Sequence, residues 1–263
     1  MIQTNFIGLA IDYYSTRYND EVCMSLGLSA RRYWLKNSSR EYLRQYNEEF
    51  ARDTKPGMIV LDAGAGEQPY RDFFHDCTYE SADFEQVDKR YAKSTYLCDL
   101  VDIPVEDGRF DRIVFNQVLE HLPDASSVLS EFNRILKPGG KIICTCPLFY
   151  DEHEKPYDFY RYTQFGLRYL FEKFGFKIER IEWMEGYFGA VAYQFQGMAQ
   201  HIPLSPHHYL RWPWWPALVW SIVALTKFSA LALSGMFYRL DLVCKITDRG
   251  YPKNYVVIVQ KEA

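Results

Sequence analysis

The stretch Val60-Leu61-Asp62-Ala63-Gly64-Ala65-Gly66-Glu67 decides the fold of this chain. The apolar run from Met58 to Leu61 predicts a buried parallel strand, and the two glycines after Asp62 predict a tight turn. In open α/β sheets, ligands bind at the carboxyl ends of the strands, where a glycine turn lets them approach the backbone. The stretch therefore predicts the first strand of an open α/β sheet with a ligand site at its end.

Two further acids stand at the ends of predicted strands. The patterns over 79–83 and 94–98 predict a second and a third strand, which lead into Asp83 and Asp99. Because neighbouring parallel strands end at the same edge of a sheet, we expect both acids to line one crevice with Asp62. Asp83 also stands 19 residues after Gly64, where a carboxylate can accept hydrogen bonds from both hydroxyls of a ribose.

Strands and helices alternate along most of the chain. Further strands are predicted over 110–116, 141–146, 176–184 and 254–261. Helices are predicted after a Ser38/Glu41 capping box, from a cap at Asp124 through Leu136, and from a cap at Thr163. This order predicts an α/β fold with a doubly wound, mostly parallel sheet of seven strands. We expect an N-terminal helical extension over 1–55, a core over 56–187 plus 251–263, and a hydrophobic helical insertion over 188–250, before the last strand.

Composition excludes several classes of protein. The 263 residues are 48% hydrophobic and 24% charged with a net charge of −4, which rules out a disordered chain and gives no concentrated basic face for nucleic acid. The six cysteines form no CxxC pair, so we expect reduced thiols and no metal site. The short apolar run over 6–11 follows no basic residue, so we expect no signal peptide and a cytoplasmic protein.

The glycine turn departs from the dinucleotide-binding pattern. A G-x-G-x-x-G fingerprint would need its third glycine at the position of Pro69. Asp62, two residues before the first glycine, would repel a pyrophosphate but attract a cationic sulfonium. The residues therefore argue against a nicotinamide-dependent oxidoreductase, which stays the alternative enzyme class.

A set of motifs continues this pattern downstream. In order, they are Leu61-Asp62-Ala63-Gly64-Ala65-Gly66, Asp83, Cys98-Asp99-Leu100, Phe110-Asp111-Arg112-Ile113-Val114, Leu119-Glu120-His121-Leu122-Pro123 and Leu136-Lys137-Pro138-Gly139-Gly140. Over residues 60–179 the chain thereby resembles the class I S-adenosylmethionine-dependent methyltransferases. One position departs from the family, because Gln68 stands where its G-x-G-x-G has the third glycine.

The resemblance implies a Rossmann-like fold and S-adenosyl-L-methionine as cofactor. It places Gly64 and Gly66 beside the methionine part, Asp83 at the ribose, Asp99 and Leu100 at the adenine, and Asn116 near the methionine end. Asp62 and Ala65 belong to the same cofactor-binding set. A scaffold that binds the cofactor without catalysis is a further alternative.

The segment 147–163 concentrates polar and aromatic residues after the fifth strand. Its run from His153 to Thr163 resembles the H-x-x-P-x-D-x-x-R-Y-T segment of a subset of these methyltransferases, often linked to cell-surface glycan or lipid pathways. We expect His153 to act as a base that Asp158 orients, with His121 as a further catalytic candidate. Arg161 and Tyr162 are the expected substrate residues, Arg161 as a clamp for an anionic group. The alternative is that His153, Asp158 and Arg161 only brace the loop.

The insertion carries a long apolar run. Ala217 to Phe237 is 21 residues long with Lys227 as its only charge, and four tryptophans stand at 212, 214, 215 and 220. Lys227 would cost about 2.5–3.5 kcal/mol at the centre of a membrane span. Peripheral contact with a membrane surface, packing as a lid or in a homodimer through 212–237, and a true span are three open interpretations.

Together these features predict a methyltransferase that acts on an oxygen or carbon of a small-molecule acceptor. The apolar insertion favours an apolar or lipid-linked acceptor, and the resemblance of the segment from His153 to Thr163 implies a glycan or lipid-linked one. We expect the protein in the cytoplasm or at the inner face of a membrane.

Overall fold

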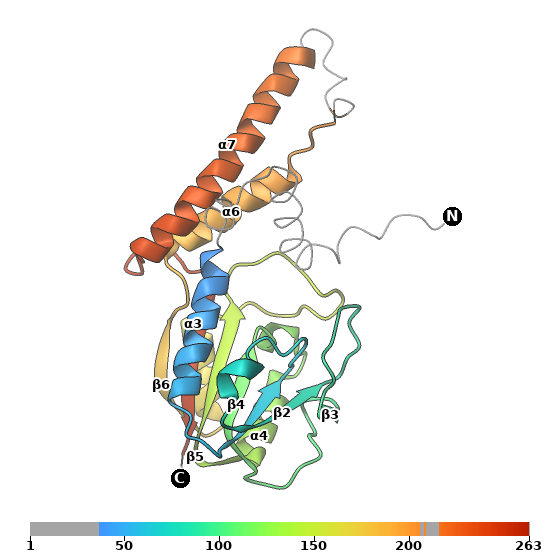
Figure 1. The fold of residues 1–263 in the computed structure, drawn as a ribbon, viewed down its shortest axis with the longest axis vertical. Coiled ribbons are helices and arrows are strands. Elements are labelled where there is room, and N and C mark those ends of the chain that lie inside the picture. The colour runs from blue at the N-terminus through green and yellow to red at the C-terminus, as the bar shows by residue number, and fades with distance from the viewer. Residues whose placement is uncertain (1–36, 206–207, 209–215, 263) are drawn as a thin grey trace, which may run out of the picture. The chain divides into compact units, whose positions relative to one another are not determined.

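A computed structural model describes residues 37–205, 208 and 216–262 (Figure 1). The chain divides into two compact units. The described residues of the first, here called the sheet unit, are 42–184 and 254–262. Those of the second, here called the helical unit, fall within 37–41 and 185–253. Trp212, Trp214 and Trp215 lie outside the described residues.

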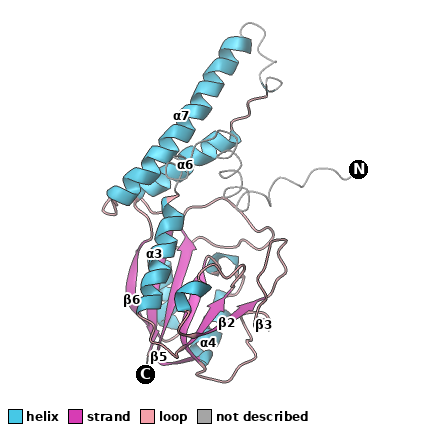
Figure 2. Ribbon diagram, in the orientation of Figure 1, coloured by secondary structure: helices cyan, strands magenta, loops and turns pink. Residues whose placement is uncertain are grey.

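The sheet unit is built on seven strands (Figure 2). They are β1 (Ile59–Ala63), β2 (Thr78–Asp83), β3 (Tyr96–Leu97), β4 (Phe110–Asn116), β5 (Leu136–Pro147), β6 (Phe176–Trp183) and β7 (Asn254–Lys261). Their order is β3-β2-β1-β4-β5-β7-β6, with β1 to β5 parallel and β7 antiparallel to both β5 and β6. The expected doubly wound, mostly parallel sheet is confirmed. Its strand order reverses between β1 and β4, which is where such sheets bind ligands.

Helices cover the sheet. They are α3 (Ser38–Arg52), α4 (Ala125–Ile135) and α5 (Gln164–Lys173), with two short 3-10 helices, η1 (Arg71–Phe74) and η2 (Leu119–His121). The caps expected at Asp124 and Thr163 are confirmed, because each side chain accepts a hydrogen bond from the backbone N–H three residues on.

Two predicted helix boundaries were wrong. The capping side chain of α3 is Asn37 rather than Ser38, since Asn37 Oδ1 accepts from the N–H of Ser39 at 2.9 Å. The α4 helix ends at Ile135, one residue early, because Leu136 is already extended and pairs with Phe110 as the start of β5.

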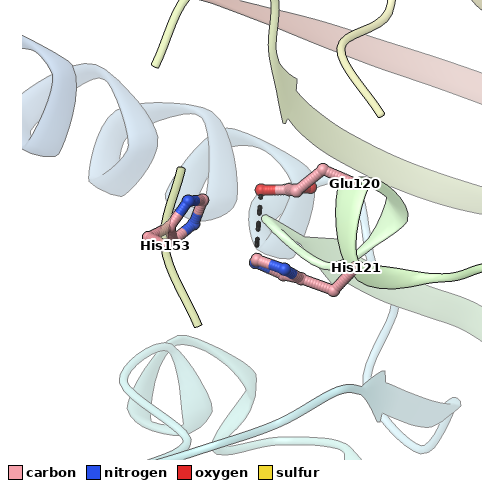
Figure 3. A group of neighbouring side chains, drawn as sticks. All are labelled: Glu120, His121 and His153. Atoms are coloured by element: carbon pink, nitrogen blue, oxygen red, sulfur yellow. Dashed lines mark ion pairs between the residues drawn. The ribbon is translucent and has the colours of Figure 1, made fainter. Parts of the chain in front are cut away.

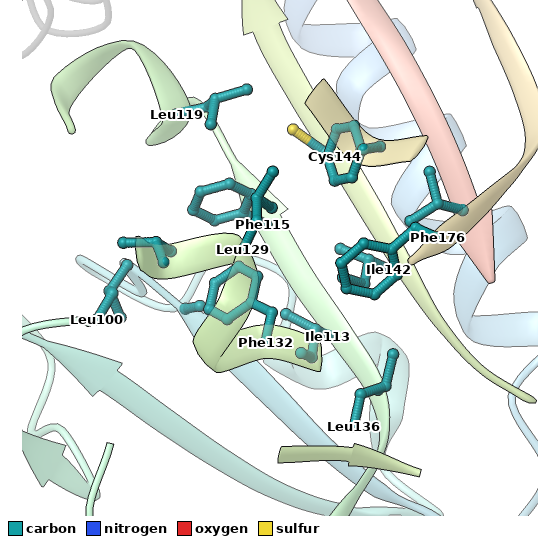
Figure 4. Packing of buried hydrophobic residues seen from close by; sticks show 14 of the residues in the cluster. Leu100, Ile113, Phe115, Leu119, Leu129, Phe132, Leu136, Ile142, Cys144 and Phe176 are labelled. Carbon is teal, nitrogen blue, oxygen red and sulfur yellow. The ribbon is translucent and has the colours of Figure 1, made fainter. Parts of the chain in front are cut away.

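The core lies on both faces of the central strands. On one face α4 contributes Val128, Leu129, Phe132 and Ile135, all fully buried, and Phe132 meets Phe115 of β4 edge to face at 4.9 Å (Figure 4). On the other face, Tyr46 and Phe50 of α3 pack against β-branched residues of β1, β4, β5 and β7. The strands are therefore rigid supports for whatever stands at their ends.

The helical unit pairs α6 (Tyr187–His201) with α7 (Pro216–Val243). The ring of Phe237 stacks on those of Phe188 and Phe195, each at 5.7 Å. Lys227 turns toward α6 and donates from Nζ to the carbonyl of Ile202 at 2.9 Å. That carbonyl belongs to the C-cap of α6, where a cation is favoured.

Much of α7 remains exposed. Its large apolar side chains open to solvent are Leu218, Trp220, Ile222, Leu225, Phe228, Leu231, Met236, Leu240 and Val243. The helix is long and apolar enough to cross a membrane over Leu218–Val243, with a mean hydropathy of 1.6 in its most apolar window. Length and composition alone are weak evidence for a span, since core helices can share both.

Candidate active site

The glycine turn follows β1 as expected. Gly64 and Gly66 have φ of +75° and +50°, the left-handed region that glycine enters without strain. A Cβ on Gly64 would collide with the side chain of Val118, whereas Gly66 has open space where its Cβ would stand. The turn is tied to β2, because Gly64 N–H donates to the carbonyl of Ala82 at 2.8 Å. This geometry fits a ligand lying against the backbone at Gly66.

Gln68 forms the turn without the third glycine. It also has a positive φ, +55°, and its side chain is buried. Nε2 donates to Ser81 Oγ and to the carbonyl of Lys93, both at 3.0 Å, and Oε1 accepts from Arg71 at 2.9 Å. Three hydrogen bonds therefore hold a conformation that a non-glycine residue would otherwise avoid.

Asp62 is a buried carboxyl at the end of β1. Tyr79 donates its hydroxyl to Asp62 Oδ2 at 2.5 Å. Burial raises the pKa of Asp62 to about 7; the Tyr79 hydrogen bond opposes this rise and the charge of Asp83 adds to it. A cationic ligand beside this carboxyl would favour its ionised form, and the turn therefore fits the charge of S-adenosylmethionine.

Asp83 is fixed at the end of β2. Its Oδ2 accepts from the N–H of Gly66 at 2.9 Å and its Oδ1 from the N–H of Glu85 at 3.0 Å. A carboxylate has about four lone-pair sites, so two remain for ribose hydroxyls. Asp99 is exposed just after β3 and accepts from the N–H of Val101, whereas the side chain of Leu100 packs into the core.

Asn116 ends β4 in a polar chain. Its Nδ2 donates to Asn47 Oδ1 at 2.8 Å, and its Oδ1 accepts from Thr145 Oγ1 at 3.0 Å. Asn47 is fully buried on α3 and was not predicted, since a lone polar residue in an amphipathic helix gives no spacing signal. A hollow of about 430 Å³ lined by Ala51, Phe73 and Cys77 lies instead at the amino ends of β1 and β2, away from these residues.

Arg161 and Asp158 brace the segment after β5. Arg161 forms a bidentate pair with Asp158 at 2.6 and 2.8 Å, and it also donates to the carbonyls of Tyr150, Asp151 and Tyr160. Although burial opposes it, the guanidinium holds the pKa of Asp158 at about 2. These contacts fit the bracing role, one of the two roles that the sequence left open for Arg161. Tyr162 is half-buried and packs against the core.

His153 and His121 come together from the segments that follow β5 and β4. The backbone N–H of His153 donates to Asp158 Oδ2 at 2.9 Å, and its Nδ1 lies 3.1 Å from the carbonyl of Asp151. His121 comes from η2 after β4, and its Nδ1 lies 2.5 Å from the carbonyl of Tyr157. The two imidazole rings are 4.6 Å apart, nearly perpendicular. Burial is the main cause that lowers the pKa of His121.

Glu120 completes this group and was missed by sequence reasoning. Its side chain is fully buried and points toward the two histidines, with Oε1 3.8 Å from His121 Nε2 (Figure 3). Burial raises its pKa to about 8. The adjacent Glu-His pair was the only signal, and nothing in the spacing distinguished Glu120 from a surface carboxylate.

The segment carrying His153 is fastened to the loop that follows Asp83. Lys89 Nζ pairs with Glu154 at 2.9 Å, and Phe84 meets Tyr157 edge to face at 5.6 Å. The segment and the glycine turn are thus linked through the loop 84–93, whose Ala92 N–H also donates to the carbonyl of Gly66. The segment that carries His153 is therefore connected, through this loop, to the glycine turn that follows β1.

Comparison with known proteins gives the same family. A family model described as a methyltransferase domain matches residues 33–181. The "Probable S-adenosylmethionine-dependent methyltransferase" of Mycolicibacterium smegmatis is 31% identical over 129 residues, 46% of this chain and 48% of that protein. A ubiquinone/menaquinone biosynthesis C-methyltransferase of Desulfotalea psychrophila is 40% identical over 63 residues, 23% of this chain and 26% of that protein. The chain thus spans about half or less of these curated relatives.

Solved structures share the fold. The [4+2]-cyclase SpnF superposes with a TM-score of 0.52 at 15% identity, covering 84% of this chain and 82% of that one. A protein of Bacillus halodurans assigned as a methyltransferase gives 0.50 at 14% identity, covering 83% and 98%. The first is a cyclase by name, so the fold alone does not decide the reaction.

The site residues and the family match identify the family more closely than the fold does. A left-handed glycine turn, a buried acid with a raised pKa and a ribose-type acid at the end of β2 fit S-adenosylmethionine, and the family match covers more than half of the chain. The chain belongs to the class I S-adenosylmethionine-dependent methyltransferases.

Proposed function

We propose that this protein transfers a methyl group from S-adenosylmethionine to an oxygen or carbon of an apolar, lipid-linked or glycan acceptor, with a hydroxyl as the first candidate. The observation that carries the proposal is the fastening of the His153 segment to the loop after Asp83. It supports the proposal because it connects the segment that carries His153 to the loop that follows the proposed ribose acid, Asp83.

The cofactor set is assigned to residues at the strand ends. The proposed set is Asp62, Gly64, Ala65, Gly66, Asp83, Asp99, Leu100 and Asn116. Asp83 would hold the ribose with the lone pairs that Gly66 and Glu85 leave free, and Asp62 would face positive charge. Because Leu100 is buried, its part would be an apolar wall rather than a polar contact.

The bound S-adenosylmethionine supplies an electrophilic methyl whose bond to sulfur breaks as the acceptor's lone pair forms the new bond, with the electron pair left on sulfur and the acceptor proton released. We assign the contact with the acceptor's reacting group to His153 and His121. Asp158 and Arg161 are positioning residues, because they form an ion pair with each other and Arg161 also donates to backbone carbonyls. Tyr162 would add apolar surface beside the acceptor.

The acceptor class rests on two supports. One curated relative is by name a C-methyltransferase of ubiquinone and menaquinone biosynthesis. Large apolar side chains of α7 are exposed, its sequence overlaps the tryptophan-rich stretch 212–220, and indoles favour the membrane interface. We therefore propose that the helical unit contacts a membrane surface where a lipid-linked acceptor resides.

Calorimetry with the full chain tests the cofactor assignment. Asp83→Ala removes charge-assisted hydrogen bonds worth about 1.5–3 kcal/mol each, so loss of two should weaken S-adenosylmethionine binding by at least about 100-fold. Asp88→Ala changes an exposed aspartate of the following loop and should leave affinity unchanged. Equal affinity in the Asp83 variant, or preference of the wild type for NADH, would overturn the assignment.

Turnover tests the reaction itself. Radiolabelled S-adenosylmethionine incubated with the protein and a bacterial lipid extract should give an organic-extractable labelled product. His153→Ala should reduce the label about 100-fold or more at unchanged cofactor affinity. Tight cofactor binding without label in lipid, glycan or small-molecule fractions would instead support a non-catalytic scaffold.

A further inference from the structure

Three side chains beside the proposed acceptor site have the composition of a metal site. Glu120, His121 and His153 each offer one ligand atom, and these atoms all lie within 4.8 Å of one another (Figure 3). We propose that Glu120, His121 and His153 bind a divalent first-row transition metal ion. The sequence predicted no metal site, because its cysteines form no CxxC pair, so this proposal departs from that prediction.

The hydrogen bonds of the two histidines point to this role. His121 Nδ1 faces the carbonyl of Tyr157, and His153 Nδ1 faces the carbonyl of Asp151 with Asp158 Oδ2 at 3.4 Å. A carbonyl only accepts, so each Nδ1 carries the hydrogen and each Nε2 keeps its lone pair. Metal-binding histidines are held in this way, with the second ring nitrogen donating to a carbonyl or a carboxylate.

The surroundings of Glu120 support a metal site independently of the two histidines. Its carboxyl is fully buried, and neither oxygen has a hydrogen-bond partner among the residues that the structure describes. A buried carboxylate without a partner is costly, and an ion bound between it and the histidines would remove that cost. The backbone carbonyl of Glu120 accepts from Phe159 and Tyr160, which fixes the residue in place.

The geometry requires only local side-chain movement. Metal–ligand bonds of about 2.0–2.2 Å put neighbouring tetrahedral ligands about 3.4 Å apart. His121 Nε2 and Glu120 Oε1 are already 3.8 Å apart, so small side-chain rotations would close the set. Two imidazoles with one carboxylate suit zinc, iron, cobalt or nickel better than magnesium or calcium, which prefer oxygen ligands.

Three protein ligands leave a position for a substrate oxygen. A hydroxyl bound to such an ion loses its proton at a much lower pH than in water, so the ion would generate the nucleophile that methyl transfer needs. This consequence rests on the proposed function, whereas metal binding itself does not. In the loaded protein His153 is a ligand, and the base expected from the sequence is replaced by the ion.

Metal titration of the full-length, tag-free, chelator-treated protein tests the proposal. Zn²⁺ should bind with a stoichiometry of one in calorimetry, and Co²⁺ should give the visible absorption of a four- or five-coordinate site. Glu120→Gln and His153→Ala should each weaken Zn²⁺ binding at least 100-fold, and Asp158→Asn about 10–100-fold as a loss of support for His153. His75→Ala removes an exposed histidine and serves as the matched control.

The outcomes separate the site from the proposed reaction. Retained S-adenosylmethionine affinity in each variant shows that the fold is intact. No stoichiometric binding of Zn²⁺ or Co²⁺, or equal Zn²⁺ affinity in Glu120→Gln and His153→Ala, would overturn the metal site while leaving methyl transfer standing. Metal binding without turnover would overturn the proposed function alone.

Discussion

The sheet unit and the helical unit place similar apolar side chains in opposite environments. In the sheet unit the residues of α4 that follow a helical period are fully buried against β4 and β5. In the helical unit α7 buries small residues such as Ala230 and Ser234, and many of its large apolar side chains are exposed. The buried arrangement gives a rigid support for the candidate active site, and the exposed one is typical of a surface that contacts a membrane or another protein.

Liposome binding probes the helical side of this comparison and has the largest expected effect. Leu225→Glu with Phe228→Glu removes two exposed apolar side chains of α7, each worth about 1.5–3 kcal/mol on burial, so liposome affinity should fall more than about 100-fold. Phe165→Glu with Tyr169→Glu makes the same change on exposed α5 of the sheet unit and should have little effect. Co-sedimentation measures both. A wild-type protein that ignores liposomes but forms dimers in light scattering would assign α7 to self-association.

Matched phenylalanines sharpen the contrast in burial. Phe132→Ala empties a fully buried position of α4 and should lower the free energy of unfolding by about 3–5 kcal/mol. Phe228→Ala on α7, where the side chain is 60% exposed, should change it by about 0.5 kcal/mol or less. Urea denaturation followed by circular dichroism compares the two variants. Similar losses would mean that α7 is covered in solution.

The turn at Gln68 tests how the sheet unit holds a strained residue. Gln68→Ala removes three hydrogen bonds but keeps the positive φ, so it should cost about 2–3 kcal/mol of stability. Gln68→Gly also loses the bonds but relieves the backbone, so it should be about 1 kcal/mol more stable than the alanine variant. Thermal or urea unfolding gives the order, and the reverse order would contradict this account of the turn.

The pH dependence of cofactor binding reports the buried acid of the sheet unit. The pKa of Asp62 is raised to about 7, above its usual 3.8, so in the unliganded protein its contribution to stability is complete below about pH 4 and is lost as pH rises through 7. A cationic ligand favours the ionised form, so S-adenosylmethionine affinity should rise about tenfold from about pH 6 to pH 8. Calorimetry should show this rise strongly reduced in Asp62→Asn. An equal rise in that variant would assign the titration to the ligand.

The sequence predicted more of the sheet unit's strand ends than of the group formed by Glu120, His121 and His153. Asp62 and Asp83 could be placed because strand ends and glycine turns leave local patterns. The meeting of His121 with His153 could not, since it depends on the path of the segment after β5. No sequence pattern marked Glu120, because the burial of a single carboxylate depends on tertiary packing.

The helical unit shows a different limit. Apolar composition predicted α7, but composition is the same for a helix facing inward and one facing outward. The extent of the helix also differed, since it continues past Phe237 to Val243. That last stretch buries Tyr238 and Asp241, which carry no apolar-run signal.

Lys227 gives α7 an unexpected property. Its ammonium group is engaged by the C-cap carbonyl of α6, so the one charge within residues 217–237 is directed away from the open apolar side. A surface without charge gains nothing from anionic headgroups and is not weakened by ionic strength. Attachment through α7 would therefore be equally strong on neutral and acidic lipids and in dilute and concentrated salt, and the helix would respond to lipid packing rather than to lipid charge.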